Sequence, residues 1–121
     1  MFGGKTILIV EDDPVSTEFM KEVLLETRAK LICCITADES IKLVKINKDI
    51  DLILMDIKLP HKSGFFATKE ILKIRKDLPI IAQTAYALEG DKQKCLDSGC
   101  VDYLSKPTLK EDLIAYVKRH I

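Results

Sequence analysis

The sequence has 121 residues, enough for one domain with a substantial core but too few for a second folded unit. Its 19 basic and 19 acidic residues balance, and its hydrophobic and charged fractions, 47% and 31%, are ordinary for a globular domain. The first apolar run stops at Glu11, too early for a signal peptide or a membrane span. We therefore predict a cytoplasmic domain at residues 5–121 after a flexible leader at residues 1–4, with no nucleic acid and no membrane as a partner.

The first predicted strand runs from Lys5 to Val10. It is continuously apolar from Ile7, as is typical of a parallel strand covered on both faces. Asp13 and Pro14 then provide an N-cap and a first helical residue. The helix that follows repeats apolar residues on one face, which we expect to pack on the sheet: Val15, Phe19, Val23 and Leu24.

The middle of the sequence repeats this alternation of strand and helix. A second strand is predicted from Leu31 to Ile35, and Asp38 is expected to cap a helix. The third strand, Leu52 to Met55, leads directly to Asp56. After a loop from Pro60 to Gly64, a helix over about residues 65–76 turns Ala67, Ile71 and Ile74 inward.

Pro79 opens the fourth strand, so the preceding helix must end before this proline. The segment from Leu88 to Ser98 has few apolar residues, so we expect its helix to be the most mobile element. After a fifth strand, Val101 to Leu104, the residues Thr108 and Glu111 have the spacing of a capping box. The last helix would bury Leu109, Leu113, Tyr116 and Val117.

Polar residues follow four of these strands, at the point where each strand ends. In an α/β fold with a parallel sheet, the carboxyl ends of the strands meet at one edge, where ligands bind. The side chains expected at this edge are Glu11, Asp12, Asp56, Thr84 and Lys106. Independent placement would scatter such residues over both ends of the sheet, so we predict one functional site.

Three carboxylates at one edge require a cation, because two unit charges about 4 Å apart repel by about 4 kcal/mol at an effective dielectric constant of about 20. Oxygen ligands without nitrogen or sulfur favour magnesium. Lys106 and Thr84 could hold further oxygens of a transferring phosphoryl group. Asp56 is the predicted nucleophile, and it needs no general base because a carboxylate is expected to be already ionised at neutral pH.

The cysteines and histidines take no part in this predicted site. The four cysteines lack zinc spacing, so we expect free, mostly buried thiols, with redox sensing by Cys95 or Cys100 as the alternative. His61 follows a proline in a loop and His120 lies near the end of the sequence, so both are expected to be solvated.

From Lys5 to His120 the sequence resembles the response-regulator receiver domain of two-component signalling. The resemblance rests on the acidic pair after the first strand and on three segments: Leu54 to Pro60 around Asp56, Gln83 to Ala85, and Ser105 to Pro107. It implies a flavodoxin-like fold in which a five-stranded parallel sheet in the order 2-1-3-4-5 has helices on both faces. It also implies a histidine kinase or a histidine phosphotransfer domain as the phosphohistidine donor.

The resemblance assigns a role to each site residue. Asp12 would bind magnesium directly, Glu11 through water, and the backbone carbonyl of Lys58 would be a further ligand, with Gly64 completing the loop. Asp13 would be only a helix cap. The bond between Lys106 and Pro107 is expected to be cis.

The resemblance also implies a switch. Phosphorylation would draw Thr84 inward and let Tyr103 turn, which would reshape the surface of the fourth helix, fifth strand and fifth helix. The alternative is a static Tyr103 that covers the edge of the sheet. Lys58, Ala85 and Tyr86 are the candidate modulatory residues, and the bulk of Lys58 and Tyr86 predicts a long-lived phosphoryl group.

Two other functions compete with this interpretation. Aspartate-nucleophile phosphatases carry a second aspartate where this sequence has Lys58, which disfavours an enzyme of that kind. An interaction module that works without phosphorylation would keep the fold but needs none of the site residues. The sequence is compatible with a stand-alone receiver, a part of a DNA-binding regulator or a part of a hybrid histidine kinase, and with a weak or phosphorylation-dependent dimer.

Overall fold

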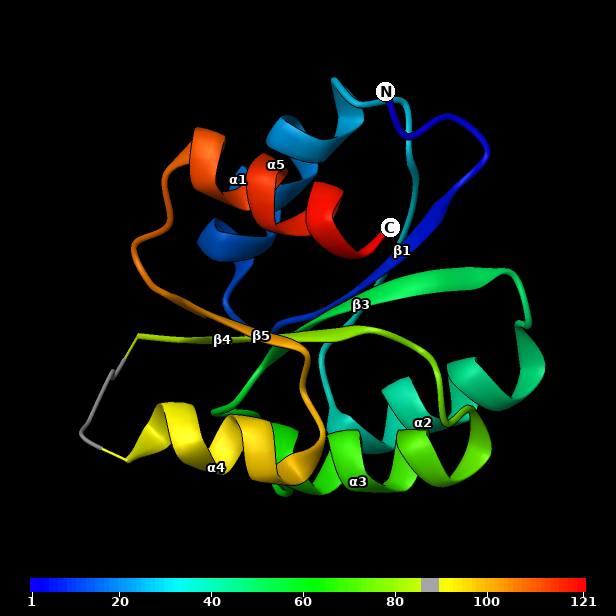
Figure 1. The fold of residues 1–121 in the computed structure, drawn as a ribbon, viewed down its shortest axis with the longest axis vertical. Coiled ribbons are helices and arrows are strands. Elements are labelled where there is room, and N and C mark those ends of the chain that lie inside the picture. The colour runs from blue at the N-terminus through cyan, green and yellow to red at the C-terminus, as the bar shows by residue number, and fades with distance from the viewer. Residues whose placement is uncertain (86–89) are drawn as a thin grey trace.

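A computed structural model describes residues 1–85 and 90–121 and contains a five-stranded parallel sheet whose strands alternate with helices (Figure 1). The strands are β1 (Thr6–Val10), β2 (Lys30–Cys34), β3 (Ile50–Asp56), β4 (Ile80–Thr84) and β5 (Asp102–Ser105). The helices are α1 (Pro14–Leu25), α2 (Ala37–Ile46), α3 (Gly64–Ile74), α4 (Asp91–Ser98) and α5 (Lys110–His120). The sheet order β2-β1-β3-β4-β5 confirms the predicted flavodoxin-like topology.

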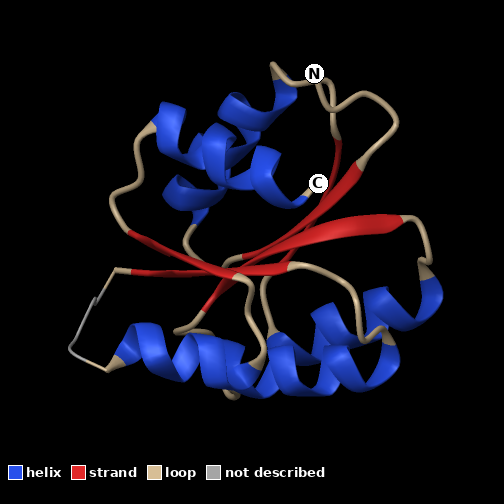
Figure 2. Ribbon diagram, viewed as in Figure 1, coloured by secondary structure: helices blue, strands red, loops and turns tan. Residues whose placement is uncertain are grey.

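Helices cover both faces of the sheet, so each face has its own hydrophobic core. Helices α1 and α5 lie on one face, and α2, α3 and α4 lie on the other (Figure 2). Alternate side chains of β1 serve the two cores, because Ile7 and Ile9 pack toward α1 and α5 while Leu8 and Val10 pack the opposite way. This double burial explains the unbroken apolar runs.

No helix in the described ranges is long and apolar enough to cross a membrane.

The predicted inward faces of the helices are partly wrong. Met20, Val23 and Leu24 form the buried face of α1, whereas Val15 is 77% exposed and Phe19 is 38% exposed. Both exposed side chains line a groove beside the loop after β5 instead of packing on a strand. The two other misplaced residues, Ile74 and Leu109, lie at the ends of their helices and are also exposed.

Two predicted helix caps are also wrong. Thr36 caps α2, because its Oγ1 accepts a hydrogen bond from the backbone N–H of Glu39 at 3.1 Å, so Asp38 lies inside the first turn. The predicted capping box of α5 does not form. The hydroxyl of Thr108 donates to the carbonyl oxygen of Ser105 at 3.3 Å, so it holds the preceding loop rather than the helix.

Part of the amino-terminal segment packs against the core. The side chain of Phe2 is buried in the core under α1 and α5, and its N–H donates to the carbonyl oxygen of Thr27 at 2.7 Å. The chain therefore packs from residue 2, before the domain boundary predicted at residue 5.

The four cysteines are free, and all except Cys33 are buried.

Helix α4 contributes little to the core. Its buried residues are Cys95 and Ser98, and Leu96 is exposed, in agreement with the polar sequence of this segment. Leu88, which was predicted to begin this helix, lies outside the described residues. The small apolar area buried by α4 supports the expectation that it opens or shifts more easily than the other helices.

The loop after β3 approaches the strand so closely that only glycine fits at position 64. The N–H of Gly64 donates to the carbonyl oxygen of Ile57 at 2.8 Å. A Cβ atom at Gly64 would lie 2.2 Å from the carbonyl oxygen of Asp56 and 2.9 Å from the Cα of Ile57. Both contacts are with backbone, so they cannot be relieved by turning a side chain.

Replacing Gly64 with alanine should therefore lower the free energy of unfolding by about 1–3 kcal/mol, the usual range for overpacking. Urea denaturation measures this change. Gly3→Ala is the matched control, because a Cβ at Gly3 meets nothing within 4 Å. Equal stability of the two variants would contradict the close approach.

An ion cluster ties the end of α5 to the start of β5. The Oδ2 atom of Asp102 lies 3.0 Å from Nε2 of His120 and 3.4 Å from a guanidinium nitrogen of Arg119. His120 is therefore partly buried against a carboxylate, and the expectation that it is solvated was wrong. Partial burial favours a higher pKa for Asp102, but the hydrogen bonds from His120 and the N–H of Tyr103, together with the nearby positive charges, hold this pKa below its usual range.

A lowered pKa means that the folded state prefers ionised Asp102, so the contact stabilises the protein above the usual aspartate pKa of about 3.9 and is lost as the pH falls through the folded value. Wild type should thus lose more stability than Asp102→Asn between neutral and acid pH. Urea unfolding of both proteins across this range tests the prediction. Parallel stability profiles for the two proteins would contradict it.

Candidate functional site

Three carboxylates meet at the carboxyl end of the sheet, as predicted. Glu11 and Asp12 follow β1, and Asp56 is the last residue of β3, which pairs with β1. One oxygen of each carboxylate lies within 4.8 Å of the others. Glu11 is 2% exposed and Asp56 is 7% exposed, whereas Asp12 faces solvent. This acidic cluster could hold a metal ion, and its open side is at Asp12.

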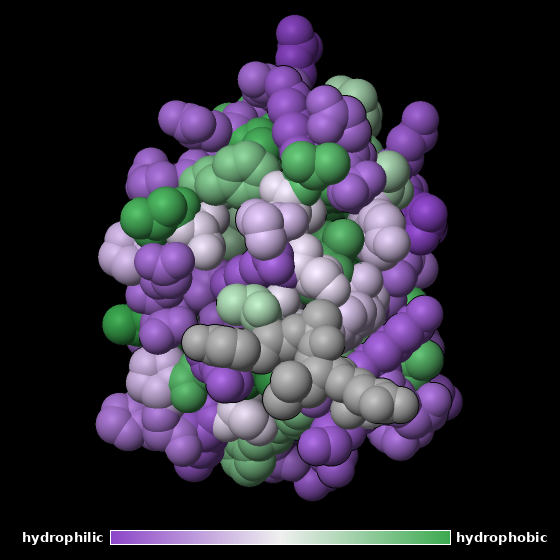
Figure 3. All heavy atoms as spheres, turned by 90° about the vertical axis from the view of Figure 1, so that its left-hand side faces the viewer, coloured by the Kyte–Doolittle hydropathy of each residue, from purple (hydrophilic) through white to green (hydrophobic). Residues whose placement is uncertain are grey.

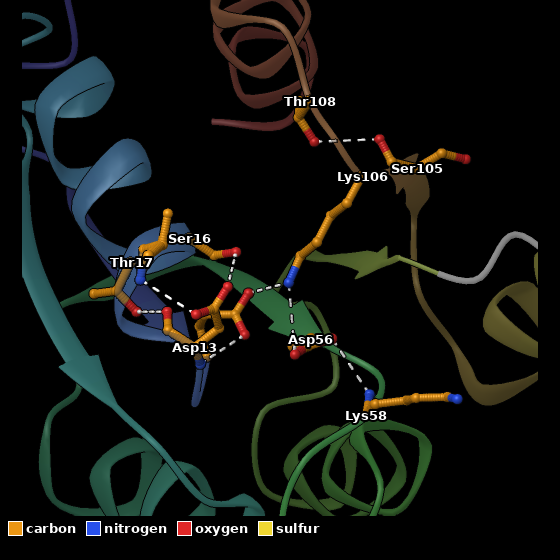
Figure 4. Close-up of polar contacts among 10 residues, drawn as sticks. Asp13, Ser16, Thr17, Asp56, Lys58, Ser105, Lys106 and Thr108 are labelled. Atoms are coloured by element: carbon orange, nitrogen blue, oxygen red, sulfur yellow. Dashed lines mark hydrogen bonds and ion pairs between the residues drawn. The ribbon is translucent and has the colours of Figure 1, made fainter.

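Lys106 extends from the loop after β5 to the acidic cluster (Figure 4). Its Nζ atom contacts Oε1 of Glu11 and lies 3.6 Å from Oδ2 of Asp56. The N–H of Lys106 donates to the carbonyl oxygen of Thr84 at 2.8 Å, which fixes the start of the loop against β4. The bond between Lys106 and Pro107 is cis, as predicted. Within the described residues, the ammonium of Lys106 thus contacts two of the three carboxylates, and one positive charge does not balance three acidic groups.

Backbone N–H groups hold the remaining carboxylate oxygens. The N–H of Lys58 donates to Oδ1 of Asp56 at 3.3 Å, and the N–H of Asp13 donates to Oε2 of Glu11 at 3.2 Å. The side chain of Asp13 itself caps α1 and accepts from the N–H of Val15 and the hydroxyl of Ser16. Its predicted role as a cap is confirmed.

The pKa of Asp56 is higher than the sequence interpretation assumed. Burial raises the pKa of this carboxyl to about 7, and the hydrogen bond and negative charge of Glu11 act in the same direction, while Lys106 and the N–H of Lys58 oppose them. Asp56 is therefore not fully ionised at neutral pH in the protein alone, contrary to expectation. A divalent cation in the cluster would favour the ionised form.

Thr84 lies at the same edge of the sheet. It is the last residue of β4, one residue beyond Gln83, which pairs in register with Asp56. The side chain of Thr84 is buried, and Ala85 is exposed. Tyr86, the third predicted modulatory residue, lies outside the described residues.

The side chains of Lys58 and Tyr103 lie away from the acidic cluster. Lys58 is exposed, and its side chain points away from Asp56 (Figure 4), so in this conformation it does not cover the carboxylate. Tyr103 is half-buried against the core on the α4 side. It lines a groove of about 340 Å³ together with residues of α4 and α5, including Lys92 and Tyr116.

Sequence reasoning missed Gln83. This residue is 3% exposed, and its Nε2 atom has no hydrogen-bond partner in residues 1–85 and 90–121. A polar amide directly after the apolar residues Ile80 to Ala82 of β4 was the available signal. Figure 3 views this end of the molecule and shows apolar surface among the hydrophilic side chains of the half formed by α1 and α5.

Comparisons with known proteins agree with this geometry. The family model of the response regulator receiver domain matches residues 7–118. The polar-differentiation response regulator DivK of Brucella ovis is 31% identical over 97% of this chain and 96% of its own length. Hybrid signal transduction histidine kinase G of Dictyostelium discoideum is 39% identical over 94% of the chain, which spans only 3% of that relative.

A solved structure shares the fold and holds a magnesium ion in its own active site cleft. It is the receiver domain of a sensor histidine kinase from Pseudomonas aeruginosa PAO1, determined with a magnesium ion coordinated in its active site cleft. The two chains are 34% identical, each is covered over 98% of its length, and the TM-score is 0.89. Because the family model covers most of the sequence and the folds coincide, the chain belongs to the response regulator receiver domain family.

Proposed function

We propose that Asp56 accepts a phosphoryl group from a phosphohistidine of a histidine kinase or a histidine phosphotransfer domain. The observation that carries this proposal is the position of Asp56, buried beside Lys106 within a cluster of three carboxylates at the carboxyl edge of the sheet. Membership of the receiver family supports the two-component setting. The free cysteines fit a reducing compartment such as the cytoplasm.

Magnesium suits the residues of the cluster. Glu11, Asp12 and Asp56 offer hard oxygen ligands, and the cluster contains no histidine or cysteine in the part of the chain that the structure describes. The family relative with magnesium in its active site cleft supports the same ion here. Asp12 and Asp56 would bind it, with Glu11 and the backbone carbonyl of Lys58 as further groups. When bound, the ion would neutralise charge on the carboxylates and on a phosphoryl group.

In the proposed transfer, an oxygen of Asp56 forms a bond to phosphorus while the bond from phosphorus to the donor imidazole breaks. The electron pair of the broken bond stays on the imidazole nitrogen, which takes a proton from solvent. Lys106 lies 3.6 Å from Asp56 and can hold one phosphoryl oxygen, and the hydroxyl of Thr84 can donate to another. The ionised carboxylate is the reactive form, so the raised pKa of Asp56 makes the reaction dependent on positive charge in the cluster.

A conformational response can follow from the same contacts. Thr84 and Lys106 are joined through their backbones, so a phosphoryl group that attracts both side chains would pull the ends of β4 and β5 together. Tyr103 lies two residues before Ser105 in β5 and faces the groove between α4 and α5. Its turn toward the sheet would reshape this α4-β5-α5 surface. Ala85 and Tyr86, which follow Thr84 in the sequence, would modulate the lifetime of the phosphoryl group together with Lys58.

Intact-protein mass spectrometry after incubation with magnesium and acetyl phosphate tests the proposal. Wild type should gain one phosphoryl group, and Asp56→Asn should gain none because the nucleophile is absent. Asp49→Asn is the matched control, since it changes an exposed aspartate before β3 and should leave the adduct intact.

An adduct that persists in Asp56→Asn would contradict the assignment of the nucleophile. No adduct from either acetyl phosphate or a purified phosphohistidine domain, in protein that is folded and binds magnesium, would instead support an interaction module that works without phosphorylation.

A further inference from the structure

We propose that a small-molecule disulfide such as oxidised glutathione oxidises Cys95 and Cys100 to a disulfide bond that fastens the last turn of α4. Both thiols are free in this structure, and neither belongs to the acidic cluster around Asp56. The modification would be independent of phosphorylation, so it lies beyond the proposed function.

The chain leaves α4 through a Schellman turn that brings the two cysteines together. Gly99 has a φ of 108°, in the left-handed region, and its N–H donates to the carbonyl oxygen of Leu96 at 3.0 Å. The N–H of Cys100 donates to the carbonyl oxygen of Cys95, also at 3.0 Å. In this motif the side chains at the positions of Cys95 and Cys100 commonly make contact. A hydrogen bond directly between the two backbones also suits the separation of about 4.4–6.8 Å between Cα atoms that a disulfide requires.

The two side chains enter the same hydrophobic core, on the side of α2, α3 and α4. Cys95 is 0% exposed and Cys100 is 5% exposed. A charge on Cys100 acts on Cys95, so the two sulfur atoms lie near each other. The other cysteines, Cys33 and Cys34, are adjacent on β2, at the opposite edge of the sheet from β5, and they point to opposite faces. Cys95 and Cys100 are therefore the pair that a disulfide can join.

Hydroxyl groups around Cys100 make it the first thiol to react. Its Sγ atom lies 3.7 Å from Oγ of Ser98 and 3.9 Å from Oγ1 of Thr68. Burial raises the pKa of Cys100, but these two hydroxyl groups act in the opposite direction and favour the thiolate. The pKa of Cys95, in contrast, is raised by burial and further by Cys100 and Asp91. The thiolate of Cys100 is thus the more abundant nucleophile.

The proposed oxidation is an exchange between thiols and a disulfide. The Cys100 thiolate attacks one sulfur of oxidised glutathione, the bond between the two glutathione sulfurs breaks, and one glutathione thiolate leaves. The Cys95 thiolate then attacks the Cys100 sulfur of this mixed disulfide and releases the second glutathione. The two protons lost by the cysteines pass through solvent to the two glutathione thiolates. The protein loses two electrons, and glutathione disulfide gains them.

Helix α4 controls access to this pair. In the present conformation both thiols are too buried to meet a reagent, so oxidation requires α4 to move away from the core. The helix has eight residues, of which Cys95 and Ser98 are buried, and its N-cap residue is Gly90, which has no side chain to cap it. An element with so few buried contacts opens locally at low free-energy cost. The disulfide would then tie the last turn of α4 to Cys100, so this turn would open less readily.

Peptide mass spectrometry of the wild-type protein tests the proposal. After incubation with excess oxidised glutathione, free thiols are blocked with iodoacetamide and the protein is digested with trypsin. Cleavage after Lys94 and Lys110 gives a peptide of residues 95–110 that contains both cysteines, because trypsin does not cut before Pro107. We expect this peptide to be lighter by two hydrogen atoms than the reduced peptide, with neither glutathione nor iodoacetamide attached.

Cys95→Ala and Cys100→Ala should each abolish the lighter peptide, and Cys95→Ala should retain glutathione on Cys100. Cys33→Ala is the matched control, because Cys33 is exposed on β2 and should not affect the bond. Hydrogen exchange at Leu96 to Gly99 should be slower in oxidised than in reduced wild type.

Four results would overturn the proposal: two free thiols after oxidation, glutathione adducts alone, a disulfide that forms only in urea-unfolded protein, or equal hydrogen exchange in the two forms. Because no phosphodonor is present, these outcomes are separate from failure of Asp56 to accept phosphate.

Discussion

The balance between one ammonium and three carboxylates governs this end of the molecule. Glu11 and Asp56 are buried, and Lys106 is the cation that reaches both of them. Like charges this close repel one another, so further positive charge at the cluster would be favourable. Burial is the main cause of the raised pKa of Asp56, and the negative charge of Glu11 adds to it. Any cation that binds only the folded state also stabilises it by mass action.

The parallel sheet makes this arrangement of charges possible. Strands β1 and β3 are neighbours, so the acidic residues at their carboxyl ends meet, although Glu11 and Asp56 are far apart in sequence. Lys106 then crosses from β5 at the edge of the sheet, over the end of β4. Gly64 allows the loop after β3 to lie directly against the backbone of Asp56. Changes in this loop should therefore affect the site and the stability together.

Lys106 also links the two faces of the sheet. On the side of α1 and α5 it lines the groove that contains the unpaired amide of Gln83. Its backbone is bonded to Thr84, and through β4 and β5 this contact leads to Tyr103 on the side of α4. Helix α4 buries few residues, so it is held to this face of the sheet by little apolar contact.

The sequence predicted the strands and the site because both follow from local patterns. Continuous apolar runs such as Ile7 to Val10 can be covered only in a two-sided sheet, and residues at the ends of such runs must meet at one edge. Helical periodicity, in contrast, predicts which face of a helix turns inward but not how far the sheet beneath it extends. Val15 and Phe19 were therefore predicted to be buried, although both are exposed. Side-chain contacts between residues far apart in the sequence could not be predicted from local patterns either. The packing of α5 on the sheet determines the contact of His120 with Asp102, and the packing of α1 surrounds the buried amide of Gln83, which has no partner among the described residues.

The central claim, that Lys106 and a divalent cation neutralise the same carboxylates, is tested most directly by the affinity for magnesium in wild type and Lys106→Met. Calorimetric titration of the unphosphorylated proteins provides this affinity. Removal of the ammonium leaves the cluster more negative, so the account predicts binding that is tighter by about tenfold, a modest fraction of the Coulomb energy at this distance. Equal or weaker magnesium binding by a folded Lys106→Met variant would contradict it.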